Sequence, residues 1–192
     1  MERKGRNTKQ VIVEEAMKLF SISGFDTVSI RTIAEAVGVG NSALYKHFRS
    51  KKEILDEIVS YSIGYYLAMG SKQMMQIQSM EDLQTACLTM FDFQTKDEWM
   101  VMFRRLLIIE QFKNPEMAEI YRKFFIELPL QAQGNLFKQL IEQGIMKEKN
   151  EKVLAMELYA PFYLYHLASD SQDNMRELFE EHIKNFWERN FV

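Results

Sequence analysis

Side chains that could carry out catalysis or bind a metal are few in this sequence and lie far apart. The three histidines are His47, His166 and His182, and the one cysteine is Cys87. None of them has the spacing of a zinc site, and no glycine-rich phosphate loop or nucleophile motif occurs. The sequence therefore predicts no enzyme, no metal site and no cofactor. A single cysteine also excludes an intrachain disulfide and fits a reducing cytoplasm.

The segment 29–48 shows a pattern typical of DNA recognition, a helix-turn-helix. Ala34 is small enough for close contact with a preceding helix, and Gly38 takes the turn. Leu44 and Phe48, four residues apart, anchor the second helix to the core. A helix of this length fits the DNA major groove, which is about 12 Å wide. Its outer face then presents Asn41, Ser42, Tyr45 and Lys46.

At these residues the chain resembles the TetR family of regulators. The resemblance covers about residues 9–58 and is carried by Ile33-Ala34, Gly38-Val39, Leu44-Tyr45-Lys46-His47-Phe48 and Lys51. It implies phosphate contacts from Ser29, Tyr45, His47 and Lys51, and base-edge contacts from Arg31, Asn41 and Lys46. The full predicted DNA-binding set is Ser29, Arg31, Thr32, Gly40, Asn41, Ser42, Ala43, Tyr45, Lys46, His47 and Lys51.

Two positions depart from the family pattern. Gly40 stands where a hydroxyl or acidic cap is usual, and Ala43 stands where threonine is common. Both changes remove possible phosphate contacts. The alternative for every residue of the set is an ordinary solvated surface position.

The charge distribution agrees with a DNA-binding N-terminus. Residues 1–52 hold ten Lys/Arg and five Asp/Glu, a net charge of +5, and the basic segment 1–8 leads into the first helix. Residues 53–192 hold fourteen Lys/Arg and twenty-two Asp/Glu, a net charge of −8. A basic end on an acidic body is expected when one end of a chain contacts phosphate.

Three prolines and eight glycines are few for this length, so long helices are predicted. Helical spacing and caps predict about nine helices. Their expected ranges are 8–23, 29–37, 41–48, 50 onward with a Ser50–Glu53 capping box, 81–94, 98–112, 115–144, 151–169 and 173–190. Pro129 and Pro161 should kink or split their helices. We therefore expect an all-α fold: a three-helix DNA-binding domain at 1–50 and a helical bundle at 51–192, bridged by the helix from about residue 50.

The segment 98–112 is almost wholly apolar, and a helix that is apolar all round lies centrally in its domain. Glu110 shares a face with Phe103 and Leu107, and a buried carboxylate needs a partner. That partner is either a ligand or an arginine, Arg104, Arg105 or Arg122. The alternative to a ligand contact is a structural ion pair or a partly exposed position at the edge of the helix. Thirteen methionines suit an adaptable apolar pocket, although a methionine-rich core without a ligand has the same composition. The predicted effector pocket is Met102, Phe103, Leu106, Glu110, Tyr121 and Phe162.

The last two helices carry more aromatic surface than a helix pair can bury alone. By resemblance they form a four-helix interface with a second copy of the chain. The predicted interface residues are Leu158, Phe162, Tyr165, Phe179, Ile183, Phe186 and Trp187. Packing within one monomer is the alternative.

These features together predict a cytoplasmic homodimer that binds a double-stranded DNA operator. No segment has about 18 consecutive apolar residues, and no signal-peptide pattern occurs, so no membrane association is expected. The resemblance implies a repressor that a small, largely apolar effector releases from its operator. The alternative is a similar DNA-binding protein that responds to a protein partner and to no small molecule.

Overall fold

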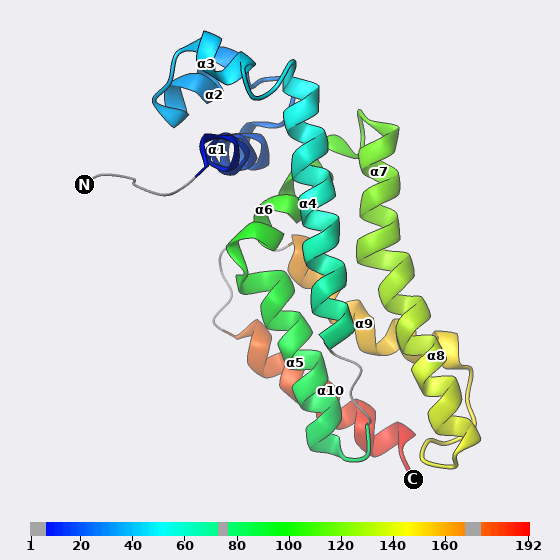
Figure 1. Cartoon of the computed structure of the whole chain (residues 1–192). Helices are drawn as coiled ribbons and strands as arrows, with labels where there is room; N and C mark the ends of the chain where they lie inside the picture. Colours follow the sequence, from blue (N-terminus) through cyan, green and yellow to red (C-terminus); the bar gives the residue numbers. More distant parts are fainter. Residues whose placement is uncertain (1–6, 73–76, 168–173) are drawn as a thin grey trace. The chain divides into compact units, whose positions relative to one another are not determined.

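The computed structural model describes residues 7–72, 77–167 and 174–192, which are helical almost throughout (Figure 1). These residues form nine continuous helical segments and no strand. One isolated antiparallel bridge joins Met146 and Phe191. The predicted all-α fold is confirmed. The predicted basic residues at 1–6, and the predicted helix ends at 168–169 and 173, lie outside the described residues.

The chain divides into two compact units, Met1–Lys72 with Glu98–Ala118, and Gln73–Asp97 with Glu119–Val192. The first unit holds α1 (Thr8–Ser23), α2 (Ile30–Val37), α3 (Asn41–Tyr45), α4 (Lys51–Lys72), α6 (Glu98–Glu110) and the start of α7 (Pro115–Arg122). The second unit holds α5 (Met80–Lys96), the end of α7, the π-helical turn η1 (Lys123–Glu127), α8 (Leu128–Glu142), α9 (Glu151–Leu167) and α10 (Met175–Asn190). The predicted boundary near residue 50 stays a prediction.

Side-chain caps begin the first two helices. Asn7 Oδ1 accepts from the backbone N–H of Lys9 at 3.1 Å, and Ser29 Oγ accepts from that of Thr32 at 3.1 Å. These bonds satisfy N–H groups that have no partner inside a helix. Gly38 ends α2 in the left-handed conformation, with φ +80°, as predicted for the turn.

Two predicted features of the next segment differ in detail. The helix predicted at 41–48 ends at Tyr45, because the N–H groups of His47 and Phe48 both bind the carbonyl of Leu44 and tighten the last turn. The predicted capping box of α4 is half formed. Ser50 Oγ accepts from the N–H of Glu53 at 3.2 Å, but the Glu53 carboxylate accepts from the N–H of Arg49 at 2.6 Å.

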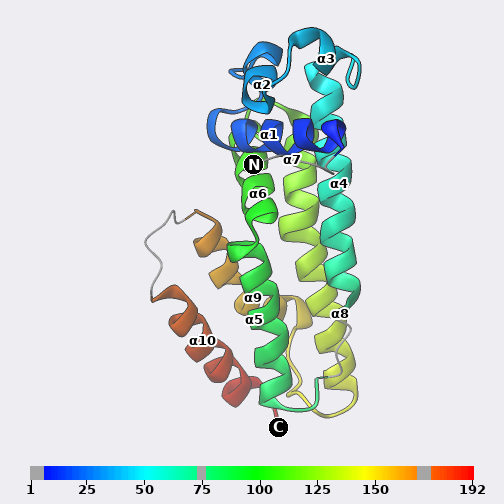
Figure 2. The ribbon, with the colours of Figure 1, turned by 60° about the vertical axis from the view of Figure 1, so that its left-hand side comes forward.

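The core of the first unit forms where α1 packs on α2, α4 and α6. Figure 2 shows α1 crossing α4 steeply, with α2 and α3 beyond it. The predicted anchors Leu44 and Phe48 are 0% and 1% exposed, and Ala34 on α2 is 1% exposed. Burying side chains of this size stabilises a fold by roughly 1.5–3 kcal/mol each. The anchoring fixes the opposite face of α3 toward solvent.

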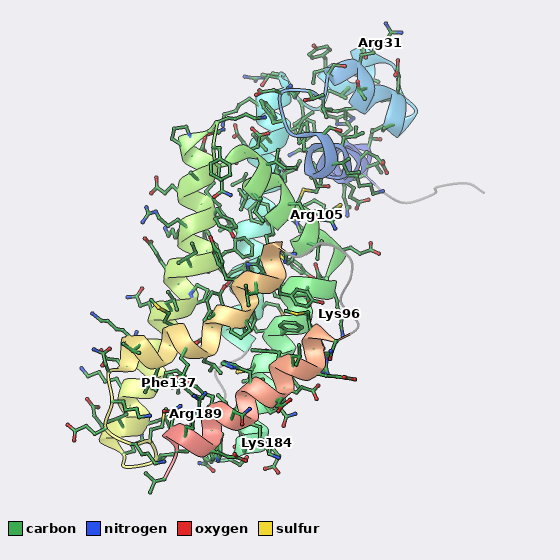
Figure 3. All side chains as sticks on the ribbon, turned by 180° about the vertical axis from the view of Figure 1, so that it is seen from behind. Arg31, Lys96, Arg105, Phe137, Lys184 and Arg189 are labelled. Carbon is green, nitrogen blue, oxygen red and sulfur yellow. The ribbon has the colours of Figure 1, made fainter. Side chains whose placement is uncertain are left out.

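The core of the second unit is largely aromatic. The ring of Phe91 on α5 lies 4.8 Å from that of Phe179 on α10 and 5.6 Å from that of Phe162 on α9. Phe137 on α8, labelled in Figure 3, packs 5.5 Å from Phe186. Cys87 is half-buried against this core, and burial raises the pKa of its thiol to about 12.

Pro129, the second residue of α8, lies two positions after the π-helical turn η1, which divides the helix predicted at 115–144. Proline has no N–H, so Pro129 cannot donate to the carbonyl of Phe125, four residues earlier, as another residue would in an α-helix. The hydroxyl of Tyr159 on α9 donates to that carbonyl at 2.7 Å, and the bond is buried. The chain therefore compensates the proline with a bond from another helix and widens the turn just before it.

Pro161 lies inside α9 and does not split it, contrary to one of the predicted outcomes. The carbonyl that it leaves without a helical donor belongs to Glu157. The ring Nε2 of His182 on α10 lies 3.0 Å from that carbonyl oxygen and donates to it. A side chain from a neighbouring helix again supplies the bond that the proline removes.

No helix among the described residues is both long enough and apolar enough to span a membrane.

Candidate nucleic-acid interface

The candidate interface is the outer face of α2 and α3. These two helices are called the reading helices below. Nearly all of the predicted contact residues are exposed there, and Ala43 and Lys51 are half-buried. The exposed ones are Ser29, Arg31, Thr32, Gly40, Asn41, Ser42, Tyr45, Lys46 and His47. Because Leu44 and Phe48 are buried behind them, the short helix presents its polar side chains together. The prediction that these residues contact DNA stays a prediction.

Tyr45 is an unusual surface residue, since 52% of this large aromatic side chain is exposed. Its neighbours Lys46 and His47 are exposed as well. An aromatic ring with a hydroxyl beside two basic side chains can pack on the sugar-phosphate backbone and donate to phosphate oxygens.

Arg31 projects from the outer side of α2, away from α1 (Figure 3). Its Nε donates to the Glu35 carboxylate at 2.9 Å, and the two side chains are 79% and 64% exposed. An ion pair this exposed is worth roughly 0–1 kcal/mol. The guanidinium can therefore leave Glu35 for a guanine edge at little cost.

The Lys51 side chain forms hydrogen bonds within the first unit, which the sequence pattern did not indicate. Its ammonium donates to the carbonyls of Phe25 at 2.6 Å and Val28 at 2.7 Å, and lies 3.3 Å from that of Asp26. It also lies 4.3 Å from the centre of the Phe25 ring. The loop between α1 and α2 thus occupies its donors, and its predicted phosphate contact stays a prediction.

Glu110 has a partner that the sequence analysis did not consider. Its Oε1 accepts from the backbone N–H of Phe25 at 2.9 Å, and the ammonium of Lys113 lies 3.8 Å away. The side chain is 3% exposed. Three arginines and a ligand were the expected partners, whereas the structure pairs the carboxylate with a backbone group 85 positions earlier in the chain.

The predicted effector residues are spread over both units. Met102 is half-buried on α6, where Phe103, Leu106 and Glu110 are buried, and Tyr121 and Phe162 are buried in the second unit. A groove of about 340 Å³ in the first unit contains none of these six residues. It is lined by Asn7, Lys9, Gln10, Val13, Glu14, Glu57, Tyr61 and Trp99. The effector pocket therefore stays a prediction.

The predicted dimer residues lie mainly inside the second unit. Trp187 is half-buried and stacks on Phe191, and the others are between 0% and 6% exposed in the single chain. A second apolar stripe on α9 was not predicted from the sequence. We call it the outer face of α9, and it consists of five exposed residues: Val153, Met156, Ala160, Tyr163 and Leu164. Its spacing of three, four, three and one residues was a readable signal. The dimer interface stays a prediction.

Residues 12–58 match the family model for bacterial regulatory proteins of the tetR family. This segment contains the reading helices, their buried anchors and the start of α4. The N-terminal segment of the chain is therefore similar to the TetR family. The family is one of regulatory proteins, not of enzymes, as the sequence predicts.

Among its relatives, the HTH-type transcriptional regulator AcrR from Shigella flexneri is 37% identical over 57 residues. That match covers 30% of this chain and 26% of the Shigella regulator, so it spans about a quarter of the relative's length.

Solved TetR-family structures resemble the fold over the whole chain. One is a family regulator from Mesorhizobium loti, with a TM-score of 0.70, 19% identity and 100% of each chain covered. Another is a complex of triclosan with SmeT, the repressor of the Stenotrophomonas maltophilia multidrug efflux pump SmeDEF. It has a TM-score of 0.68 and 18% identity, and covers 97% of this chain and 93% of that one.

Proposed function

We propose that this chain is a homodimeric, cytoplasmic transcription regulator that binds operator DNA through α2 and α3. The observation that carries the proposal is the exposed polar face of the reading helices within a family-matched segment. Lys46 and Arg31 are long cationic side chains, suited to guanine edges in the major groove. Tyr45, His47 and Ser29 contact the phosphates on either side.

We further propose that the regulator is a repressor, released by a small and largely apolar effector. The triclosan complex of a structurally similar regulator supports a ligand of this kind. The effector acts by favouring a dimer in which the two pairs of reading helices no longer match half-sites about one DNA turn apart. Because α4 follows the reading helices directly in the chain, it is the natural lever for such a shift.

The DNA-binding proposal is tested with a duplex selected by the wild-type protein from a random library, and with a scrambled duplex. Lys46→Ala should weaken binding to the selected duplex by about tenfold or more and to the scrambled one far less, because a base contact is worth roughly 1–3 kcal/mol. Lys18→Ala on α1 is the matched control, since its exposed ammonium pairs with Glu15. Equal losses for Lys46→Ala and Lys18→Ala would contradict a base-reading role.

The effector proposal is tested with triclosan itself. A ligand that binds only the folded state raises the melting temperature. If triclosan also releases the protein from DNA, it lowers the affinity of the protein for the selected duplex. The reason is that ligand binding and DNA binding are reciprocally coupled. A screen of apolar compounds that gives melting shifts but unchanged duplex affinity would contradict release by an effector.

A further inference from the structure

The turn between α1 and α2 is held from two sides through one residue, Phe25. Glu110, the last residue of α6, accepts a hydrogen bond from the N–H of Phe25 at 2.9 Å. Lys51, the first residue of α4, donates to the carbonyl of Phe25 at 2.6 Å and lies over its ring. Both backbone polar groups of one residue therefore bind side chains from two other helices of the same unit.

Glu110 occupies a place that is unfavourable for a carboxylate. It is 2% exposed, and it lies at the C-terminal end of a helix, where the helix dipole repels negative charge. Burying a charge destabilises a fold unless its bonds offset the desolvation. The bond to Phe25 and the nearby ammonium of Lys113 are the contacts that do so. The position of the carboxylate is thus explained by the turn that it holds.

Gly24 permits the close approach of α6 to this turn. Its φ is +77°, and a Cβ atom there would lie 2.9 Å from Glu110 Oε1 and 3.1 Å from Ile109 Cγ2. Such backbone angles are rare for residues with a side chain. A larger residue would be strained at this φ and would displace the Glu110 carboxylate or the Ile109 side chain, so Gly24 favours the Glu110–Phe25 bond.

Lys51 extends the same grip toward α2. Its bond to the carbonyl of Val28 reaches the residue just before Ser29, the N-cap of α2. The ammonium therefore holds both ends of the loop that enters the first reading helix.

We propose that Glu110 and Lys51 are positioning residues, which hold the Phe25 turn between α6 and α4 and so orient α2 and α3 for DNA. The proposal rests on the DNA-binding function proposed above. Because α6 holds the turn directly, a shift of α6 along its axis either breaks the Glu110–Phe25 bond or moves the turn with it.

The direction in which Glu110→Ala changes the affinity for DNA separates a positioning role from a purely electrostatic one. Glu110→Ala removes a negative charge from the DNA-binding unit, so electrostatics alone predicts equal or tighter binding to DNA. Positioning predicts about tenfold weaker binding to the selected duplex, since a hydrogen bond to a charged group is lost. Glu110→Gln keeps an acceptor oxygen and should restore most of the affinity. Glu116→Ala, at an exposed carboxylate paired with Lys52, is the control and should bind as the wild type does.

Amide hydrogen exchange tests the contact without DNA. The N–H of Phe25 should exchange at least tenfold faster in Glu110→Ala than in the wild type, while α1 keeps its protection. Glu110→Gln should give an intermediate rate. Unchanged Phe25 exchange, or tight duplex binding by a folded Glu110→Ala, overturns the proposal. If the wild type binds no duplex, the proposed function fails, while the exchange experiment still decides the contact.

Salt dependence separates positioning by Lys51 from direct phosphate binding. If Lys51→Met loses only positioning, duplex affinity falls about tenfold, the slope of log affinity against log salt is unchanged, and the Phe25 amide exchanges faster. A slope smaller by about 0.9 for each lost phosphate contact, with unchanged Phe25 exchange, would assign Lys51 to DNA and remove it from the proposal.

Discussion

Gly40 precedes the first residue of α3 in an extended conformation, with φ −75° and ψ 154°, and supplies no side-chain cap. A Cβ atom there would meet only Ser42 Oγ, at 3.9 Å, so serine fits the fold. Glycine caps a helix within a few tenths of a kcal/mol of serine, so Gly40→Ser should hardly change the free energy of unfolding. We expect several-fold tighter binding to selected and scrambled duplexes alike, because the new hydroxyl lies where a helix N-terminus attracts phosphate.

Gel-shift titrations of the wild type, Gly40→Ser and Gly40→Ala measure this effect. Alanine adds the Cβ atom without the hydroxyl and controls for steric hindrance. Weaker binding by both variants would show instead that Gly40 allows DNA to approach the backbone closely.

Tyr159 donates the bond that replaces the one Pro129 cannot make. Tyr159→Phe leaves the buried carbonyl of Phe125 without this donor, which costs about 1–3 kcal/mol of unfolding free energy. Urea melts monitored by circular dichroism measure the loss. Tyr163→Phe on the same helix, at a ring that is 41% exposed, should change the midpoint little. An equal midpoint for Tyr159→Phe and the wild type would mean that η1 satisfies its carbonyl in another way.

At the scale of elements, His182 links α10 to the proline-containing α9. Burial lowers the pKa of His182 below its ordinary value of 6.5, against weaker opposing effects of the Glu157 carbonyl and carboxylate. The unfolded chain therefore binds the proton more readily than the folded chain. The contribution of neutral His182 to folding stability is therefore complete above about pH 6.5. It is lost as the pH falls through the pKa of His182 in the unfolded chain and then through its lower pKa in the folded chain.

We expect His182→Gln, which keeps an N–H donor but does not titrate, to lose less stability than the wild type between pH 7 and pH 5. Thermal melts across this range measure the difference between the two slopes. The exposed His47, changed to Gln, is the control. Parallel slopes for the wild type and His182→Gln would assign the acid sensitivity to other groups.

Helix positions followed from the sequence because their causes are local. Caps at Asn7 and Ser29, and the glycine at Gly38, act within a few residues of the helix ends, and the predicted boundaries of α1 and α2 agree with the structure. The π-helical turn could not be predicted, because it depends on a bond from Tyr159, 34 positions away. The partner of Glu110 was missed for the same reason.

Periodicity also could not assign the faces of α9. This helix is apolar on two sides: Leu158 and Phe162 face the core of the second unit, and Met156 and Leu164 face solvent. A helical pattern shows that a face is apolar, but not whether its own chain or another covers it. The predicted DNA contacts were easier to identify, because buried anchors on one face of a short helix leave the opposite face exposed.

At the scale of the whole molecule, the outer face of α9 gives the dimer proposal a sharper test. Met156→Glu with Leu164→Glu places charge on side chains that are 63% and 64% exposed. If this face is the interface, sedimentation should show the 22.8 kDa monomer in place of a dimer of about twice that mass, with circular dichroism unchanged.

Two controls interpret that result. Ile22→Glu changes another exposed apolar residue, on α1, and should leave the dimer intact. Phe186→Asp changes a side chain that is 0% exposed and should unfold the second unit, because it buries an unpaired charge. A dimeric Met156→Glu/Leu164→Glu protein would place the interface elsewhere.

The half-buried Cys87, whose thiol pKa is raised, makes this chain suited to site-directed spin labelling. With a pKa of about 12, almost none of it is thiolate at neutral pH, so it should react far more slowly with thiol reagents than an exposed cysteine. Ser60→Cys on the exposed side of α4 would then carry one nitroxide per subunit in an otherwise native background. In a dimer, the two labels define a single distance. Pulsed electron paramagnetic resonance can measure that distance with and without DNA or triclosan. The change in distance shows how far the α4 helices of the two subunits move apart.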